Sequence, residues 1–463
     1  MVRIALWIAV PVILYVLPVP AGLSPAAWQL FAVYMAAILG LILRPFSEPV
    51  VLLTVIAASS VLFRNTAVVL SGYANPTVWL VFTAFLISAA IIETGLGRRI
   101  AYLLIGRFGR STLGLGYVFA VTDLALAPVT PSNTARSGGI VFPIVRSLAV
   151  SLGSTPGPDS RKVGAYLTVL LYSISLTTGY IFLTAIAPNL ITAKFGQDIL
   201  KIDASWATWA TGAVVPGLIC LAIVPYLVYR LYPPQLKTFD NKTLSHEGLA
   251  QLGAMSGKEK RLLVLFVLAI LGWATGNLTR IDAPAVALAF ATLAVVTRVV
   301  TWDTLVGLKS AWSTLIWYGG IVGLADGLAR AKFFDWLAEL VRLHLDLTGL
   351  NQIAVMGGLT LLSLAMRYLF ASQAAFCSTM VPVFFTIAVA GHLPLYPFFF
   401  LIAFATCYGT ALTHYGGALG PVLFGEGYVG QWMWWFIGGM TVLMSVAVHL
   451  VVGLPYWQAI GFG

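Results

Sequence analysis

Apolar segments long enough to cross a bilayer recur along the whole chain, and no other feature constrains its fold as strongly. The eleven segments lie near 4–22, 27–43, 48–63, 77–94, 163–193, 207–230, 262–277, 284–300, 311–328, 395–413 and 430–453. Because 60% of the 463 residues are hydrophobic and only 9% are charged, a soluble core could not keep this apolar surface from water. We therefore expect an all-α, polytopic membrane protein with eleven transmembrane helices.

Two further apolar regions, 112–153 and 350–391, do not fit this simple pattern. Each is too long for one crossing and is interrupted midway by small or polar residues, at 131–139 and at 371–379. Two ordinary crossings per region are an alternative, but halves of about 15 residues are short for a hydrocarbon core about 30 Å thick. A re-entrant hairpin, which enters the membrane and leaves by the same side, fits better, so we predict two of them.

The positively charged loops indicate the orientation, since Lys and Arg collect on the cytoplasmic side of a membrane protein. The more basic side holds Arg3, Arg44, the stretch 98–110 and the loop 230–261, whereas the opposite loops hold fewer charges, such as Arg64 and Arg280. We therefore expect a cytoplasmic N-terminus and a C-terminus outside. The formal net charge of +10 collects in these short loops, so it does not indicate a nucleic-acid partner.

The two predicted hairpins are related as an inverted repeat. "PSNTARSGGIVFP" begins its polar stretch at Ser132, and "ASQAAFCSTMVPVF" begins its own at Ser372. Each hairpin is followed by a crossing with an irregular end, "TAIAPN" at 184–189 and "THYGGALGP" at 413–421. Two hairpins and two broken helices in matching places indicate a transport site at the bilayer midplane.

Ser132, Asn133 and Thr134 at the first tip are well suited to bind an anion. A helix that begins inside the membrane leaves its first N–H groups unpaired, and all three residue types are good N-caps. Their hydroxyls and N–H groups, together with the helix dipole, favour a carboxylate at the tip. Simple capping of the turn is the alternative interpretation.

Arg136 strengthens the anion hypothesis because its position is otherwise unfavourable. A cation in the first turn of a helix opposes the dipole, and its burial in the membrane costs at least about 2.5–3.5 kcal/mol. We therefore expect Arg136 to have an anionic partner; a side chain that extends to the cytoplasm is the alternative. Asp123, Asp326 and Arg367 are expected in polar networks whose other members the sequence does not name.

These residues resemble a known family. "APVTPSNTARSGG" resembles the Ser-Asn-Thr signature of the divalent anion/sodium symporter family, and its "SNTAR" form is similar to the exchanger branch. That branch includes plastid 2-oxoglutarate/malate translocators and bacterial citrate/succinate and tartrate/succinate antiporters. Other matching stretches, among them "NPTVWLVFTAFLIS", "FLTAIAPNL" and "STLIWYGGIV", extend the resemblance over nearly the whole chain.

The resemblance implies a homodimeric, elevator-type transporter of the bacterial inner membrane, in which a transport domain moves against a scaffold. The scaffold would comprise 1–111 and 262–349. The transport domain would comprise 112–232 and 350–463, each with a hairpin, a broken helix and a following helix. Residues 233–261 would form a cytoplasmic loop.

The resemblance also assigns site residues. Those expected to bind substrate are Ser132, Asn133, Thr134, Arg136, Ser372, Gln373, Gly417 and Ala418, with Asn189, Arg367, Thr413 and His414 as supporting residues. Arg136 would stand where symporters bind sodium. The second tip departs from the family, because Ala374, Phe376 and Gly417 stand where relatives have Thr, His and Thr. Gln373, Arg367 or His414 are the residues that could compensate for these lost polar groups.

The sequence thus predicts a secondary transporter of small organic anions, with di- and tricarboxylates such as citrate as substrates and sodium-independent exchange as the mode. Sodium-coupled symport is one alternative, and transport of a monocarboxylate or sulfonate, indicated by the altered second tip, is another. An enzyme or a channel is not expected, because hydrolase motifs and a selectivity filter are lacking. We expect no cofactor and no metal, since Cys220, Cys377 and Cys407 stand singly in apolar segments.

Overall fold

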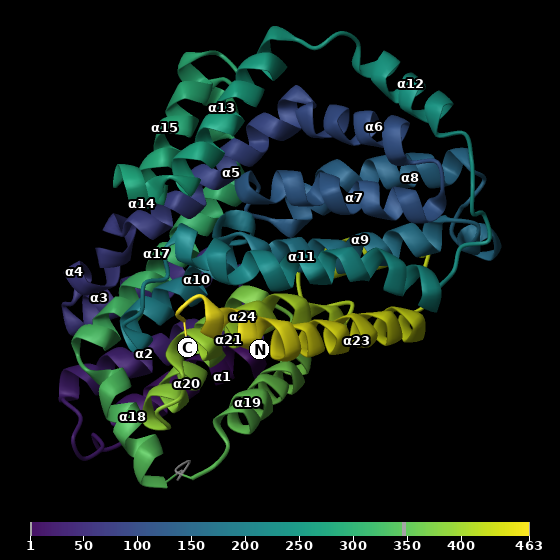
Figure 1. Cartoon of the computed structure of the whole chain (residues 1–463). Helices are drawn as coiled ribbons and strands as arrows, with labels where there is room; N and C mark the ends of the chain where they lie inside the picture. Colours follow the sequence, from purple (N-terminus) through teal and green to yellow (C-terminus); the bar gives the residue numbers. More distant parts are fainter. Residues whose placement is uncertain (1, 345–348, 463) are drawn as a thin grey trace.

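The computed structural model describes residues 2–344 and 349–462, in which every regular element is helical (Figure 1). Parts of three predicted domains, namely Met1, 345–348 and Gly463, lie outside the described residues. Within the described ranges, nine helices are long and apolar enough to cross a membrane, and three shorter ones are also apolar. The predicted all-α class is confirmed, and the number of eleven crossings stays a prediction.

Six α-helices of the described residues precede the first hairpin, and side chains cap two of them, the second and the fifth. The six are α1 (Val2–Val16), α2 (Pro25–Leu43), α3 (Glu48–Phe63), α4 (Thr66–Leu70), α5 (Pro76–Thr94) and α6 (Leu96–Phe108). Ser24 accepts a hydrogen bond from the N–H of Ala27, and Asn75 accepts one from the N–H of Thr77. In both helices a proline follows the cap, where its missing N–H leaves no bond unmade.

The chain turns back at 130–132, within the first region predicted to form a hairpin. The turn is flanked by α7 (Thr112–Leu126) and η2 (Ala127–Val129) on one side, and by the π-helix η3 (Thr134–Val141) and α8 (Phe142–Ser151) on the other. Pro128 and Pro131 bracket the end of the incoming helix, and a proline cannot supply the N–H that a continuing helix needs. The break therefore follows from the sequence.

The second turn lies at 370–372. It joins α19 (Gln352–Met366) and η7 (Arg367–Leu369) to α20 (Gln373–Ala390). Ser372 is the N-cap of α20, and its hydroxyl accepts a hydrogen bond from the N–H of Ala375. Both turns overlap the polar stretches from which they were predicted.

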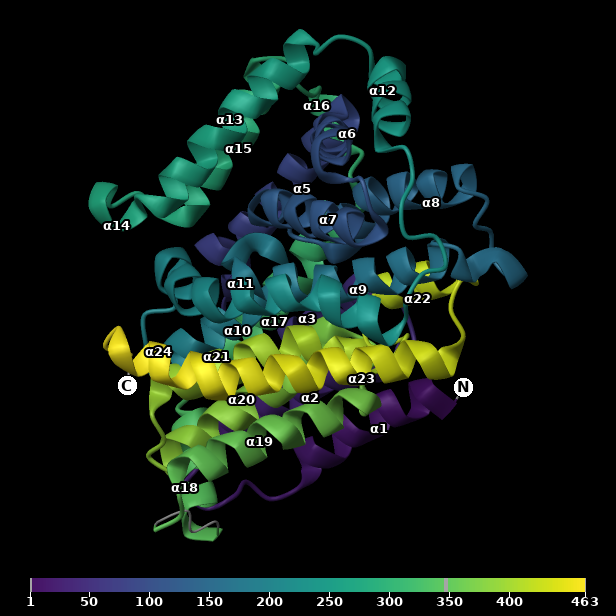
Figure 2. The same ribbon diagram turned by 45° about the vertical axis from the view of Figure 1, so that its right-hand side comes forward.

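Each turn is followed by an interrupted helix, as the irregular stretches predict. The first interruption, η5 (Leu183–Ala185), separates α9 (Gly164–Ile181) from α10 (Ala187–Phe195); the second, η8 (Gly409–Leu412) and an irregular stretch, separates α21 (Leu395–Tyr408) from α22 (Leu419–Phe424). All residues of α9 are buried, and α11 (Trp206–Leu231) and α23 (Gln431–Val448) pack beside it (Figure 2). The helix that leads to the first interruption therefore lies at the centre of the molecule.

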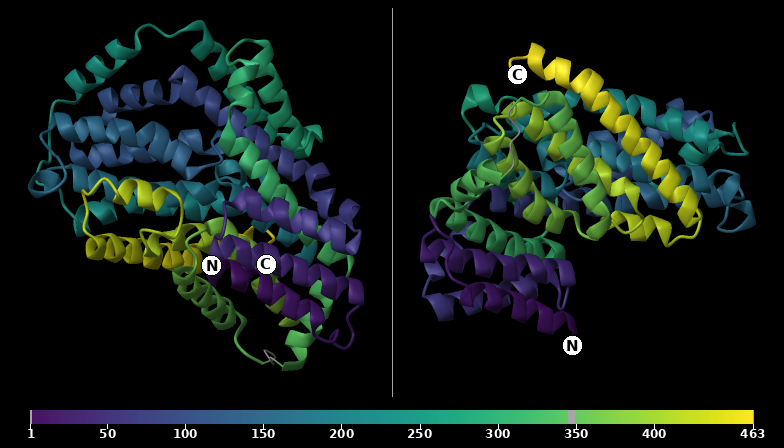
Figure 3. Two further views of the ribbon diagram at one scale, coloured as in Figure 1. Left: turned by 180° about the vertical axis from the view of Figure 1, so that it is seen from behind. Right: turned by 90° about the horizontal axis from the view of Figure 1, so that it is seen from below.

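The remaining helices follow α11 in the chain. They are α12 (Asn241–Leu252), α13 (Gly257–Ala274), α14 (Gly276–Thr279), α15 (Ala283–Val296), α16 (Trp302–Val306), α17 (Lys309–Arg330), α18 (Phe333–His344) and α24 (Leu454–Ala459). Helix α12 lies within the segment predicted as a loop. Asp240 caps this helix, and the hydroxyl of Ser245 donates a hydrogen bond to the carbonyl oxygen of Tyr102 in α6 (2.7 Å). The N- and C-termini lie at opposite ends of the layered helices in Figure 2, and the terminal helices lie apart in the view from below (Figure 3).

Glycines allow α17 to approach the short helix η1 (Ser71–Ala74) at backbone distance. A Cβ atom added to Gly72 would lie 2.0 Å from the carbonyl oxygen of Gly319 and 2.3 Å from the backbone nitrogen of Gly323. Backbone atoms cannot rotate away as a flexible side chain can, so the contact requires glycine.

We predict that Gly72→Ala lowers the free energy of unfolding by at least about 1–3 kcal/mol, because the added methyl group forces two backbones apart. The apparent melting temperature of the purified protein in detergent measures this effect. Gly439→Ala is the matched control, since nothing lies within 4 Å of a Cβ at that helical glycine. Equal melting temperatures for the two variants would contradict the prediction.

Candidate functional site

Both hairpin tips open onto one cavity of about 400 Å³, which we call the central cavity. Its walls include residues 131–134 of the first tip, 371–374 of the second tip, and 186–188 and 417–421 at the two helix interruptions. Arg44, Glu48, Phe85, Thr314 and Trp317 line the side formed by α2, α3, α5 and α17. The structure therefore brings together the four irregular segments that the sequence singled out.

At the first tip, Ser132, Asn133 and Thr134 all line the central cavity. The Ser132 hydroxyl accepts a hydrogen bond from the N–H of Ala135 (3.3 Å), so it caps the outgoing helix. Ser132 and Thr134 are partly exposed, whereas Asn133 is buried and its side-chain oxygen accepts a hydrogen bond from Arg136 (2.7 Å). The hydroxyls of Ser132 and Thr134 thus face the cavity, and the Asn133 amide between them is hydrogen-bonded to Arg136.

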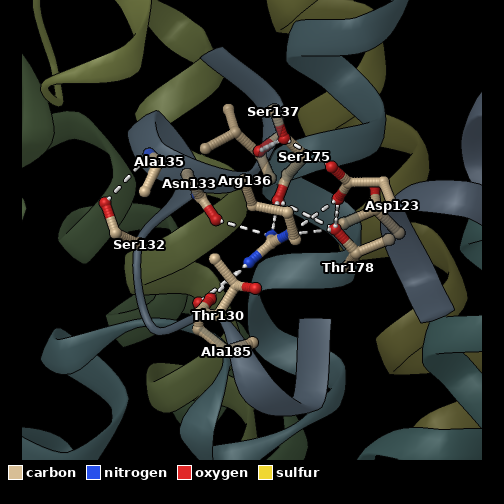
Figure 4. A network of polar contacts seen from close by, with 12 residues as sticks. Asp123, Thr130, Ser132, Asn133, Ala135, Arg136, Ser137, Ser175, Thr178 and Ala185 are labelled. Atoms are coloured by element: carbon tan, nitrogen blue, oxygen red, sulfur yellow. Dashed lines mark hydrogen bonds and ion pairs between the residues drawn. The ribbon is translucent and has the colours of Figure 1, made fainter. Parts of the chain in front are cut away.

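Arg136 lies behind the first tip and does not line the central cavity (Figure 4). Its side chain is fully buried, and its Nε lies 3.0 Å from a carboxylate oxygen of Asp123 in α7. The hypothesis of an anionic partner is correct, but the partner in this structure is Asp123 and not a bound anion. The alternative, a side chain that extends to the cytoplasm, is wrong, because burial inside the bundle leaves the guanidinium no path to water.

The other guanidinium donors join three separate segments. They reach the carbonyl oxygens of Thr130 (2.9 Å) and Ala185 (3.0 Å), the side chain of Asn133 (2.7 Å) and the hydroxyl of Thr178 (3.2 Å). Asp123 also accepts hydrogen bonds from the hydroxyls of Ser137 and Thr178. Arg136 therefore fixes the first tip against α9 and against the interruption at η5.

Arg367 has a similar role at the second tip, although it precedes its turn whereas Arg136 follows its own. Its side chain is buried, and Nη2 donates to the hydroxyl of Thr410 (3.0 Å) and to the carbonyl oxygen of Gly416 (2.5 Å). It therefore joins the second hairpin to the second helix interruption. Within the described ranges Arg367 has no carboxylate partner, and its Nε and Nη1 atoms make no hydrogen bond. The guanidinium lies over the ring of Phe376, with its Cζ atom 4.8 Å from the ring centroid.

The second tip presents fewer polar groups to the central cavity. Ser372, Gln373, Gly417 and Ala418 line it as predicted from the resemblance, but Gly417 and Ala418 offer only backbone atoms. The amide of Gln373 donates to the carbonyl oxygen of Thr406 (3.1 Å), which ties it to α21. The altered tip therefore presents one hydroxyl-bearing side chain, Ser372, where the first tip presents two.

The four residues predicted to support the site do not line the central cavity. Asn189 donates to the carbonyl oxygens of Gly179 (2.8 Å) and Phe182 (3.1 Å), which stabilises the first interruption. His414 accepts a hydrogen bond from the indole of Trp435 (3.1 Å), which ties its ring to α23. Thr413, like Arg367, holds the second interruption, because its carbonyl oxygen accepts a hydrogen bond from Tyr172 (3.1 Å).

Several residues of this region were not found from the sequence. Arg44, Glu48 and Tyr172 line the central cavity, but they lie far from both tips in the chain. The Asp123–Arg136 pair had a usable signal: two opposite charges inside an apolar region, on either side of a predicted turn. Asp326, expected in a polar network, pairs with Lys194 (2.7 Å).

We predict that Asp123→Asn lowers the free energy of unfolding by about 3–5 kcal/mol, because it leaves a buried guanidinium without its counter-charge. The double variant Asp123→Leu/Arg136→Leu should recover part of this loss, since it removes both charges. Melting temperatures in detergent provide the measurement. Glu339→Gln is the control: it breaks an exposed pair with Arg342 that solvent screens, so the melting temperature should change little. Additive losses in the double variant would contradict the pairing.

Known proteins resemble this chain along its length. The family model described as the sodium:sulfate symporter transmembrane region matches residues 1–462. The inner membrane protein YbhI of Escherichia coli (strain K12) is 47% identical, over 98% of this chain and 97% of that protein. The putative malate transporter YflS of Bacillus subtilis (strain 168) is 36% identical, over 100% of this chain and 97% of that protein.

A further relative and a solved structure extend the comparison. The L-tartrate/succinate antiporter of Escherichia coli (strain K12) is 35% identical, over 98% of this chain and 97% of that protein. The crystal structure of the YdaH transporter of Alcanivorax borkumensis superimposes with a TM-score of 0.60, over 87% of this chain and 90% of that chain. At 12% identity, that structure supports the fold alone.

Proposed function

This chain belongs to the family of the sodium:sulfate symporter transmembrane region, and from that membership we propose that it exchanges small organic dicarboxylates across the bacterial inner membrane. The family and the curated relatives are transporters and not enzymes. Relatives that cover nearly the whole chain are named as malate and tartrate/succinate transporters, which favours an organic anion as the substrate.

The proposal rests on the central cavity, because two groups of residues suited to bind an anion line it. The hydroxyls of Ser132 and Thr134 lie at the beginning of one helix, and Ser372 caps another. Helix N-termini attract negative charge through their unpaired N–H groups and the dipole. A molecule with an acidic group at each end therefore fits the cavity; citrate, a tricarboxylate, belongs to the same proposed class.

Exchange without sodium is favoured by the two buried arginines. Oxygen ligands suit a sodium ion, as they suit other hard cations, and the oxygens nearest each tip already accept hydrogen bonds from a guanidinium. Arg136 donates hydrogen bonds to the carbonyl oxygens of Thr130 and Ala185, and Arg367 donates one to the carbonyl oxygen of Gly416. A sodium ion there would also meet a like charge in a medium of low dielectric constant. Sodium-coupled symport is the alternative.

The proposed mechanism is an elevator movement within each protomer of a homodimer. Residues 112–232 and 350–463 would move, carrying both tips, while 1–111 and 262–349 would remain as the scaffold. The position of the central cavity supports this division, because the first pair of segments contributes both tips and the second contributes α2, α3, α5 and α17. A cytoplasmic N-terminus and an external C-terminus agree with the opposite positions of the termini in Figure 2.

The altered second tip leaves a monocarboxylate or a sulfonate as the second candidate substrate. Ala374 and the backbone of Gly417 provide less hydrogen bonding than a Thr pair would, and a lost hydrogen bond to a charged group costs about 1.5–3 kcal/mol. Competition between succinate, citrate, butyrate and a short sulfonate for labelled-malate uptake distinguishes these classes.

We predict that purified protein in liposomes takes up labelled malate only when the liposomes contain a counter-anion such as succinate. Replacement of sodium by potassium or choline should leave the rate unchanged, because the guanidinium groups already occupy the oxygen ligands at the tips. Sodium-dependent uptake into empty liposomes would reject exchange in favour of symport.

We also predict that Thr134→Ala lowers the exchange rate at limiting malate about tenfold or more, because a hydrogen bond to a charged group contributes about 1.5–3 kcal/mol. Thr54→Ala is the matched control, since that hydroxyl donates to the Val50 carbonyl on an exposed helix face. Near-normal exchange by Thr134→Ala would contradict the prediction and would mean that the residues of the first tip only cap the helix.

A further inference from the structure

The turn between α2 and α3 supplies Arg44 and Glu48, the two charged side chains among the described residues that line the central cavity. The guanidinium Nη2 of Arg44 lies 3.6 Å from a carboxylate oxygen of Glu48, and the side chains are 47% and 31% exposed. Both residues also line an adjoining opening of the cavity, together with Ser310, Thr314 and Trp317. The pair is therefore reachable by water and by a solute.

Glu48 and Ser372 of the second tip line the same central cavity, close enough that the Ser372 hydroxyl stabilises the charged form of the Glu48 carboxylate. The hydroxyl oxygen of Ser372 accepts a hydrogen bond from the N–H of Ala375, so the hydroxyl proton remains available for donation to a carboxylate. Glu48 thus lies at the N-terminus of the 18-residue helix α20, where the dipole favours an anion. An acidic side chain of the protein itself therefore lies beside the half of the cavity that has fewer polar groups.

We propose that Glu48 is a tethered carboxylate that fills the second half of the anion site when no substrate is bound, and that the second acidic group of a substrate displaces it. This inference rests on the proposed function, since it takes the central cavity as the binding site of a dicarboxylate. Arg44 is the second partner of Glu48 and stabilises the carboxylate once it has left Ser372. The occupant belongs to α3 and the tip to α20, so the contact also joins the proposed scaffold to the proposed moving domain.

Two consequences follow from this arrangement. A substrate with two acidic groups can replace Glu48 at Ser372, but a monocarboxylate held at Ser132 and Thr134 leaves the tether in place. An empty cavity leaves it in place as well, so the unloaded domain is held and uptake requires an anion on the other side. The fraction of protein in which Ser372 is free lowers the apparent affinity by the same factor.

Exchange of labelled succinate by the full-length protein in liposomes tests the proposal. Glu48→Gln removes the competing charge, so KM for succinate should fall about threefold or more, and butyrate should begin to compete. Arg44→Gln removes the alternative partner of Glu48, so KM should rise. A merely structural ion pair would shift KM in the same direction in both variants, and that result overturns the proposal, as does an unchanged or raised KM in Glu48→Gln.

Glu426→Gln is the matched control. Glu426 lies 3.5 Å from Arg146 with its side chain 25% exposed, but it does not line the central cavity, so KM should not change. Should Glu48→Gln fail to fold, Glu48→Asp shortens the reach to Ser372 by one methylene and should also lower KM. Normal exchange by the unchanged protein together with an unmoved KM in the variants rejects this inference alone. If the unchanged protein exchanges neither succinate nor malate nor tartrate, the proposed function fails and this inference fails with it.

Discussion

The first half of the central cavity depends on the buried ion pair between Arg136 and Asp123. The first tip and the interruption at η5 leave carbonyl oxygens without helical partners, and an unpaired polar group inside a membrane protein is costly. Arg136 donates to the carbonyl oxygens of Thr130 and Ala185, and Asp123 lowers the free-energy cost of burying the guanidinium by neutralising its charge. Because Arg136 pairs these two carbonyl oxygens from behind the tip, they do not compete for the hydroxyls of Ser132 and Thr134, which face the cavity.

The second half repeats this arrangement with a different charge balance. Arg367 also joins a tip to a helix interruption, yet it has no carboxylate partner among the described residues and lies over the ring of Phe376. A ring face attracts a cation less strongly than a carboxylate does. The two halves of the inverted repeat therefore differ in electrostatics: the first is close to neutral, whereas the second retains a positive charge behind a tip with few polar groups.

The sequence predicted the helical class, the positions of both turns and both interruptions, because prolines, glycines and small polar residues within apolar segments directly limit how a helix continues. It also predicted that Arg136 has an anionic partner, but it named no partner, since a pairing across a turn depends on how far each side chain is buried. Arg44 and Glu48 could not be found in this way. They belong to the cavity only because α2 packs beside α20 and α3 packs beside α2, and no local pattern carries that information.

The origin of these two charges bears on how the cavity would behave during the proposed movement. Residues of both tips would travel together in that movement, so the contacts that they make with a substrate would stay the same on either side of the membrane. Arg44 and Glu48 belong to the part proposed to stay in place, so they face the tips in the present arrangement and are left behind after the movement. The cavity would then be lined by charged side chains on one side of the membrane and by uncharged ones on the other. Discrimination between one and two acidic groups would therefore belong to the side on which Glu48 and Ser372 line the same cavity.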